Sequence, residues 1–267
     1  MKIAYSGIEG AFAYIAAKRI FPDEELVAFG DFHSAYQAVE NNKCDYAVLP
    51  IENSYAGDVG QVTDLMFQGE LFVNGVYTLN VVQNLLGVKG ATLQSIKKVI
   101  SHPQALEQCA EFLRAHNYES IEAVNTARAA RQVAQDNDPT VAAIASEETA
   151  ALYGLQVLAQ GINEQQDNST RFVVLSKNQN QKVCKDCDSG TFIMMFAVKN
   201  EAGALVKVLN RLGEFGYNMV AIHSRPLKSH AWEYYFYIEV EGNSSQNDFE
   251  QMVHEIQYRC DKLKIFR

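Results

Sequence analysis

Two short polar segments have residue types that could bind a small ligand carrying carboxylates. Residues 50–54 read PIENS, with a carboxylate, an amide and a hydroxyl in consecutive positions, and residues 168–172 read NSTRF. A helix cap or a turn does not need three different polar side chains in a row, so we interpret the first segment as functional. Arg171 in the second could bind a carboxylate through its planar guanidinium, or it could form an ordinary salt bridge at a surface strand.

Further polar side chains follow two predicted strands, at residues 97–101 and 121–124. In open α/β sheets, small ligands bind beyond the carboxyl ends of the strands, where hydroxyls, amides and helix N-termini suit carboxylates. Taken singly, Asn125 and Ser146 are better explained as helix caps. The candidate ligand-binding residues after these two strands are Ser101, His102, Gln104, Gln108, Asn125 and Thr126.

The composition disfavours several other kinds of partner and site. The 267 residues have a net charge of −9 and no basic run, so nucleic acid is not an expected partner. No apolar stretch approaches the ~18 residues of a membrane span. Five cysteines without an export signal predict reduced thiols in the cytoplasm. Cys184 and Cys187 lack the second pair of ligands that a zinc site needs, and no dinucleotide or phosphate-binding loop is present.

The order of the predicted elements indicates an α/β fold in two lobes. Strands and helices alternate through the first 160 residues, a pattern typical of a mostly parallel sheet. An apolar, β-rich run at residues 71–88 interrupts this alternation and is expected to carry the chain into a second lobe, with a cleft between the two. We therefore predict a first lobe at about 1–75 and 160–178 and a second at about 76–159.

The C-terminal part of the chain differs in kind. A polar segment without periodicity predicts a linker at residues 179–189. Residues 190–267 then show the order strand, helix, strand, strand, helix, strand, which is that of an α+β ferredoxin-like module.

Several motifs occur in order along the whole chain. They are GIEGAFA at 7–13, PIENSYAG at 50–57, SHPQALEQC at 101–109, NTARAA at 125–130, LYGLQVL at 152–158 and NSTRFVVL at 168–175, with GALV at 203–206 and HSRP at 223–226 in the C-terminal module. Together they resemble the motifs of the prephenate dehydratase family. The resemblance implies a two-lobed, periplasmic-binding-protein-like catalytic domain at residues 1–178 and an ACT regulatory domain at 190–267. It also implies the monofunctional form, because no chorismate mutase domain precedes Met1.

The resemblance implies an enzyme of phenylalanine biosynthesis that converts prephenate to phenylpyruvate, CO2 and water without a metal or organic cofactor. It places Thr170 at the departing hydroxyl as a hydrogen-bond donor, and Glu52 and His102 are the ionisable candidates for replacing its proton. The implied substrate-binding residues are Glu52, Asn53, Ser54, Ser101, His102, Gln104, Gln108, Asn125, Thr126, Arg171 and Phe172.

Feedback inhibition by L-phenylalanine and assembly into a homodimer or homotetramer through the ACT domains are also implied. The effector would lie between two chains. Two residues depart from the family pattern: Ala13 replaces a Ser or Thr, and His223 replaces a Glu, which we expect to weaken effector binding. The implied effector residues are Glu201, Gly203, Ala204, Leu205 and Val206 of one chain with His223, Ser224, Arg225 and Pro226 of the other.

Two alternatives remain open at this point. Arogenate dehydratase is the nearest alternative enzyme, since its substrate differs from prephenate only by an amino group in place of the side-chain keto group. A two-lobed protein that captures an amino acid without chemistry would also fit the predicted fold, although such a binder has no need of the segment around Thr170.

Overall fold

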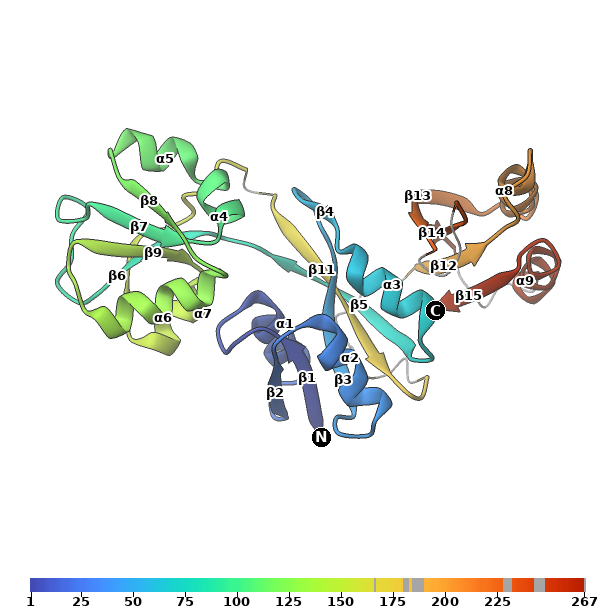
Figure 1. Ribbon diagram of the computed structural model, residues 1–267, viewed down its shortest axis with the longest axis horizontal. Helices are drawn as coiled ribbons and strands as arrows, with labels where there is room; N and C mark the ends of the chain where they lie inside the picture. The colour runs from blue at the N-terminus through green and yellow to red at the C-terminus, as the bar shows by residue number, and fades with distance from the viewer. Residues whose placement is uncertain (166, 180–182, 184–189, 228–231, 243–247, 267) are drawn as a thin grey trace.

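The computed structural model describes residues 1–165, 167–179, 183, 190–227, 232–242 and 248–266. Its strands form three separate sheets that follow one another along the long axis of the molecule (Figure 1). The first lobe lies in the middle, with the second lobe on one side and the C-terminal module on the other.

The first lobe is built on a mixed sheet of strand order β2-β1-β3-β11-β5, with β4 paired to β3. The antiparallel strand β11 lies between β3 and β5, so within this sheet only β1, β2 and β3 pair in parallel, as the alternation of strands and helices predicts. The strands are β1 (Lys2–Ser6), β2 (Glu25–Phe29), β3 (Tyr46–Asn53), β4 (Gly57–Asp58), β5 (Phe72–Asn80) and β11 (Ser169–Ser176), and the helices are α1 (Phe12–Ile20), α2 (Phe32–Glu40) and α3 (Gly60–Gln68).

The second lobe has a sheet of order β10-β6-β9-β7-β8, in which β7 is parallel to both its neighbours and β6 is antiparallel to its own. Helix caps lie where the sequence predicts them: Pro103 opens α4, and Asn125 and Ser146 cap α6 and α7 through their side chains. The elements are β6 (Asn84–Gly87), β7 (Lys98–Ser101), α4 (Pro103–Gln108), α5 (Ala110–Ala115), β8 (Glu119–Glu122), α6 (Thr126–Asp136), β9 (Val141–Ala145), α7 (Glu147–Tyr153) and β10 (Gln156–Ala159).

The chain crosses between the lobes later than predicted on the outward path. Strand β5 stays in the first sheet up to Asn80, and β6 starts the second sheet at Asn84, so the crossing lies at residues 81–83 rather than near 75. The apolar run at 71–88 contains two strands that belong to different sheets. Both strands are apolar, so the composition does not reveal the break between them.

The C-terminal module has the predicted βαββαβ order and an antiparallel sheet of order β13-β14-β12-β15. Helices α8 and α9 pack on one face of this sheet, and its other face packs against the first lobe, where Met195 and Tyr235 share a core with Met66 and Phe67. The elements are β12 (Thr191–Ala197), α8 (Ala204–Glu214), β13 (Asn218–Pro226), β14 (Tyr234–Glu241), α9 (Phe249–Gln257) and β15 (Lys262–Phe266).

Candidate active site

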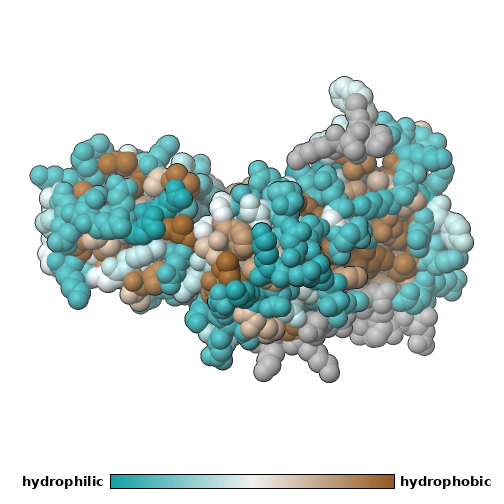
Figure 2. Space-filling view, turned by 60° about the horizontal axis from the view of Figure 1, so that its bottom comes forward, coloured by the Kyte–Doolittle hydropathy of each residue, from teal (hydrophilic) through white to brown (hydrophobic). Residues whose placement is uncertain are grey.

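A cavity of about 540 Å³ lies between the two lobes. The surface is hollowed between them in the space-filling view (Figure 2). Residues at or just beyond the carboxyl ends of β1, β2, β3, β7 and β8 line it. This agrees with the strand-end rule, by which small ligands bind beyond the carboxyl ends of the strands of an open α/β sheet. The lining residues from the first lobe and the crossings are Ser6, Gly7, Ala11, Phe12, Ala13, Gly30, Asp31, Phe32, Pro50, Asn53, Val59, Gln61, Val81, Gln83, Asn168, Thr170 and Phe172, and those from the second lobe are His102, Gln104, Ala105, Gln108, Asn125 and Thr126.

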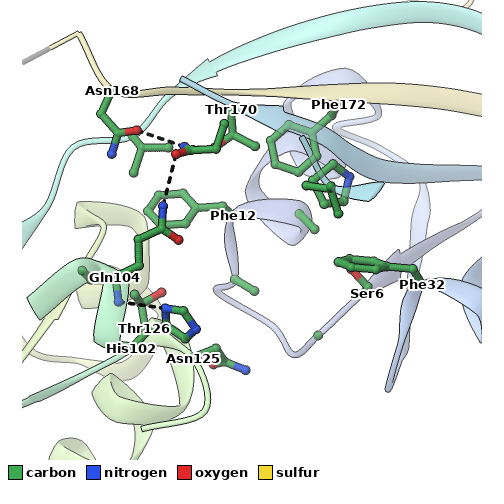
Figure 3. Close-up of a pocket in the computed structure, with 18 of the residues that line it drawn as sticks. Ser6, Phe12, Phe32, His102, Gln104, Asn125, Thr126, Asn168, Thr170 and Phe172 are labelled. Atoms are coloured by element: carbon green, nitrogen blue, oxygen red, sulfur yellow. Dashed lines mark hydrogen bonds between the residues drawn. The ribbon is translucent and has the colours of Figure 1, made fainter. Parts of the chain in front are cut away.

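Strand β11 carries Thr170 and Phe172 into the cavity (Figure 3). Successive side chains of a strand point to opposite faces, so these two residues share the cavity face and Arg171 lies on the other. The Thr170 Oγ1 accepts a hydrogen bond from the Asn53 Nδ2 at 2.9 Å. Because this contact uses a lone pair of the hydroxyl, the hydroxyl proton stays available for donation into the cavity.

Asn53 connects the Thr170 hydroxyl to both lobes. Its Oδ1 accepts from the backbone N–H groups of Tyr55 and Ala56, and from the Gln104 Nε2 across the cavity at 3.1 Å. Its Nδ2 also lies 3.0 Å from the Asn168 Oδ1. These contacts orient the amide so that its N–H₂ group faces Thr170.

A chain of buried amides continues from Asn168 towards the crossing. The Asn168 Nδ2 donates to the Gln108 Oε1 at 3.0 Å, and the Gln83 Nε2 lies 3.4 Å from the same oxygen. Gln83 is 3% exposed, and its Oε1 has no hydrogen-bond partner among the described residues. Gln83 was not among the predicted site residues, because no motif marks it in the short crossing between two apolar strands.

His102 precedes α4 and lines the cavity from the second lobe. Its Nδ1 accepts from the backbone N–H of Gln104 at 3.3 Å. An acceptor Nδ1 places the proton of the neutral ring on Nε2, so His102 can act as a hydrogen-bond donor through Nε2.

Most of the predicted substrate-binding residues lie together in the cavity, namely Asn53, His102, Gln104, Gln108, Asn125, Thr126 and Phe172, beside Thr170. The others do not line it. Ser101 is buried and its hydroxyl donates to the Ile144 carbonyl, while the Ser54 hydroxyl accepts from the Ser169 N–H. Both hydroxyls are therefore structural, and their assignment as substrate ligands is corrected.

The assignment of Arg171 and Glu52 to substrate is also corrected. The Arg171 Nη1 lies 2.6 Å from the Glu239 Oε1 and 3.3 Å from the Glu52 Oε2, on the side of the sheet that faces the C-terminal module. The two charged side chains therefore pair with each other and with Glu239. The salt-bridge interpretation of Arg171 is confirmed, but the side chains of Arg171 and Glu52 are mostly buried, with 21% and 34% exposed, rather than on the surface.

The cavity lining also includes Phe12, Phe32 and Gln61, which were not among the predicted site residues. The first two follow β1 and β2, so the strand-end rule could have found them. Ala13, which replaces a Ser or Thr of the family pattern, also lines the cavity. The replacement therefore removes a hydroxyl from the cavity wall.

The predicted effector residues fall into two groups within one chain. Gly203 has φ +81° and precedes α8, and Val206 is exposed on that helix. His223 and Arg225 instead face the first lobe, where they pair with Asp58 at 3.1 Å and Asp64 at 2.9 Å. Glu201, Ala204 and Leu205 lie at the start of α8, whereas Ser224 and Pro226 lie on the opposite face of β13 from His223.

The described cysteines are free thiols, and burial raises the pKa of Cys109 and of Cys260 to about 12. Cys184 and Cys187 lie outside the described residues. In the described part of the chain, no group of three or more His, Cys, Asp or Glu could hold a metal ion. No helix there is long and apolar enough to cross a membrane.

The family model "Prephenate dehydratase" matches residues 3–180. The bifunctional chorismate mutase/prephenate dehydratase of Enterobacter agglomerans is 37% identical over 270 residues, which cover 99% of this chain and 69% of that protein. Among solved structures, a prephenate dehydratase from Arthrobacter aurescens in complex with L-Phe has a TM-score of 0.88 at 25% identity, covering 100% of this chain and 88% of that one.

A second solved structure is equally similar in fold but has a different name. GqqA, described as a novel type of quorum quenching acylase, has a TM-score of 0.88 at 27% identity and covers 100% of this chain and 96% of its own. The match of the family model over most of the chain and the identity to the Enterobacter protein decide the family. The chain belongs to the prephenate dehydratase family.

Proposed function

We propose that the cavity between the lobes converts prephenate to phenylpyruvate, CO2 and water, with Thr170 as the donor to the departing hydroxyl. The observation that carries this proposal is the contact between the Asn53 Nδ2 and the Thr170 Oγ1, which leaves the hydroxyl proton free on the cavity side. As the bond from the ring to its carboxylate breaks, the electron pair enters the ring and CO2 leaves. The bond to the ring hydroxyl breaks at the same time, and the departing oxygen takes the Thr170 proton and leaves as water.

The lining of the cavity suits this reaction because it offers little stabilisation to the carboxylate that leaves as CO2. The described residues that line the cavity include no Lys or Arg, and Phe12, Phe32 and Phe172 provide apolar walls. A carboxylate in such surroundings is poorly stabilised, whereas neutral CO2 is not, so the environment favours decarboxylation. Amide groups and the Nε2–H of His102 remain to orient the substrate.

Proton balance requires that Thr170 recover its proton after each turnover. A hydroxyl oxygen that gives up its proton becomes strongly basic, and the Asn53 Nδ2 donates to that oxygen while the charge lasts. The proton comes from bulk solvent, either through water in the open cleft or through the Nε2–H of His102, which is then reprotonated from solvent.

An acylase function would require a base beside the attacking hydroxyl. The Thr170 Oγ1 is instead bonded to an amide nitrogen, which cannot accept a proton. The geometry around Thr170 therefore favours proton donation over nucleophilic attack.

The direct test is to incubate the purified chain with prephenate and to measure the absorbance of phenylpyruvate in alkali. Arogenate at the same concentration, with phenylalanine as the measured product, identifies the preferred substrate. Binding of prephenate without any product would support the non-catalytic alternative and contradict the proposal.

Gln104 reaches across the cavity to Asn53, and we expect Gln104→Ala to raise KM more than it lowers kcat. The substitution removes a link between the lobes but leaves the contact between Asn53 and Thr170 in place. A loss of one neutral hydrogen bond is worth about 1 kcal/mol, or roughly a fivefold rise in KM. Steady-state kinetics with prephenate check this, and a fall in kcat with constant KM would contradict it.

Regulation by L-phenylalanine is the second part of the proposed function. The Arthrobacter relative was crystallised with L-Phe, and the turn before α8 of this chain presents backbone N–H groups that can bind a carboxylate. Strand β13 is an edge strand that exposes Val220 and Ile222, so a second copy could pair there and complete the site with Ser224 and Pro226. Light scattering coupled to gel filtration measures whether such a dimer or tetramer forms.

We expect Gly203→Val to raise the Kd for L-phenylalanine by about tenfold or more, because Val is strained at a φ of +81°. Gly213→Ala is the control, since Gly213 lies in α8, the helix that Gly203 precedes, has no positive φ and has open space around it. Calorimetric titration gives both constants. Equal Kd values for wild type and Gly203→Val would exclude this turn from the effector site.

A further inference from the structure

Two neighbouring positions on β11 connect opposite sides of the first lobe. Thr170 lies directly across from Asn53 on β3, and Arg171 lies directly across from Glu52. The first pair is joined by a hydrogen bond on the cavity side and the second by an ion pair on the side of the C-terminal module. A shift of Arg171 along the strand therefore also shifts the Thr170 hydroxyl relative to Asn53.

The C-terminal module holds Arg171 from behind. Glu239 on β14 is 5% exposed, and its Oε1 contacts the Arg171 Nη1 at 2.6 Å, closer than the Glu52 contact at 3.3 Å. The Tyr237 hydroxyl donates to the same Glu239 oxygen at 2.5 Å. Burial raises the pKa of Tyr237 well above its usual value, so this hydroxyl remains a donor. A buried, charge-assisted contact of this kind constrains geometry more than an exposed ion pair does.

The same interface contains a second group of the same composition. The Arg225 guanidinium on β13 forms two bonds to the Asp64 carboxylate on α3, and the Tyr235 hydroxyl donates to Asp64 at 2.7 Å. Both groups therefore join an Arg, a carboxylate and a Tyr across the boundary between the module and the first lobe. The two groups differ in the element of the first lobe that they hold. Only the first contacts β11, at the residue next to Thr170, whereas the second contacts α3.

We propose that Glu239, acting through Arg171, is a positioning residue for Thr170, so that the C-terminal module sets the rate of the reaction through strand β11. The inference rests on the proposed function, in which Thr170 donates the proton. It gives a physical route for regulation: a ligand that moves β14 relative to the first lobe changes how Arg171 is shared between Glu239 and Glu52, and with it the alignment of Thr170 and Asn53.

The test compares Glu239→Gln with Asp64→Asn, each of which removes one charge and keeps the shape of the side chain. We expect Glu239→Gln to lower kcat by about 3- to 30-fold with KM changed less than about twofold, in the range of mutations that alter coupling between sites. Asp64→Asn is expected to lower the Tm by about as much as Glu239→Gln does, but to leave kcat within about twofold of wild type. Comparison of these two variants distinguishes an effect on the position of Thr170 from a general weakening of the contact between the module and the first lobe.

Two further measurements keep the result interpretable. In a Thr170→Ala background, Glu239→Gln should have no additional effect on the residual rate, because no hydroxyl remains to be positioned. Hydrogen exchange at the backbone amides of β11 should be faster in Glu239→Gln than in Asp64→Asn, and this readout needs no turnover. A wild-type chain without prephenate turnover would contradict the proposed function alone, and the exchange data would still test the coupling.

The proposal would be overturned by equal kcat values in the two variants, by additive effects in the Thr170→Ala background, or by unchanged exchange on β11. If Glu239→Gln does not fold, Tyr237→Phe replaces it, because this variant keeps the ion pair but removes the hydroxyl that orients Glu239. The same pattern, with a smaller fall in kcat, is then expected.

Discussion

Thr170→Ala should lower kcat for prephenate by about 10²- to 10⁴-fold, the range for the loss of a positioned proton donor. The departing hydroxyl would then leave without its donor in a cavity whose walls are largely apolar. KM should change little, because the hydroxyl assists the departure rather than the binding of the carboxylates. Thr170→Ser should retain much more activity than Thr170→Ala, since it keeps the hydroxyl that faces Asn53.

Initial rates of phenylpyruvate formation across a range of prephenate concentrations give both constants. Circular dichroism and the Tm establish that the variants remain folded, and Val173→Ala on the same strand controls for a general loosening of β11. Equal rates for Thr170→Ala and wild type would remove Thr170 from the mechanism.

Asn53→Asp should lower kcat by about 10²- to 10³-fold, as the loss of a donor to a developing negative charge does in other enzymes. The variant keeps an oxygen for the Tyr55 and Ala56 N–H groups, so the turn after β3 is preserved. It replaces the Nδ2 donor beside Thr170 with an oxygen that carries negative charge. The Thr170 oxygen would then lose its stabilisation at the moment when the proton is transferred.

Gln104→Ala is the matched control, because it removes one contact of the Asn53 Oδ1 while the Tyr55 and Ala56 N–H groups still bind that oxygen and orient the amide. Its kcat is expected to stay near that of wild type, while its KM rises. An Asn53→Asp enzyme with kcat within tenfold of wild type would show that the amide only shapes the turn.

Local sequence signals predicted the elements well. Alternation of strands and helices indicated the α/β lobes, and Asn125, Ser146 and Pro103 lie at the helix starts that their side chains favour. These signals succeed because capping and strand-to-helix alternation depend on neighbours within a few residues. The crossing between the lobes was misplaced because β5 and β6 are both apolar, and which sheet a strand joins depends on distant partners.

The candidate site was predicted in part for the same reason. The strand-end rule predicted that Asn53, His102, Gln104 and Thr126 lie at one ligand site, and the family resemblance added Thr170. All of them line the cavity. It could not separate the residues of PIENS and NSTRF that face the cavity from those that face away. Side chains alternate along a strand, so the sequence shows that Thr170 and Arg171 point in opposite directions but not which direction is the cleft.

The sequence by itself determined the residue types of the site, the order of the elements and the family to which the motifs belong. Only the tertiary structure decided that Arg171 is bound to Glu239, 68 positions away along the chain, and is therefore not free for a substrate carboxylate. Whether a carboxylate lies near enough to pair with Arg171 depends on how the C-terminal sheet docks on the first lobe. Apolar contacts such as that of Phe67 with Tyr235 hold the two together. Local patterns carry no information about such docking, because it depends on the shapes of two surfaces that form only after each part has folded.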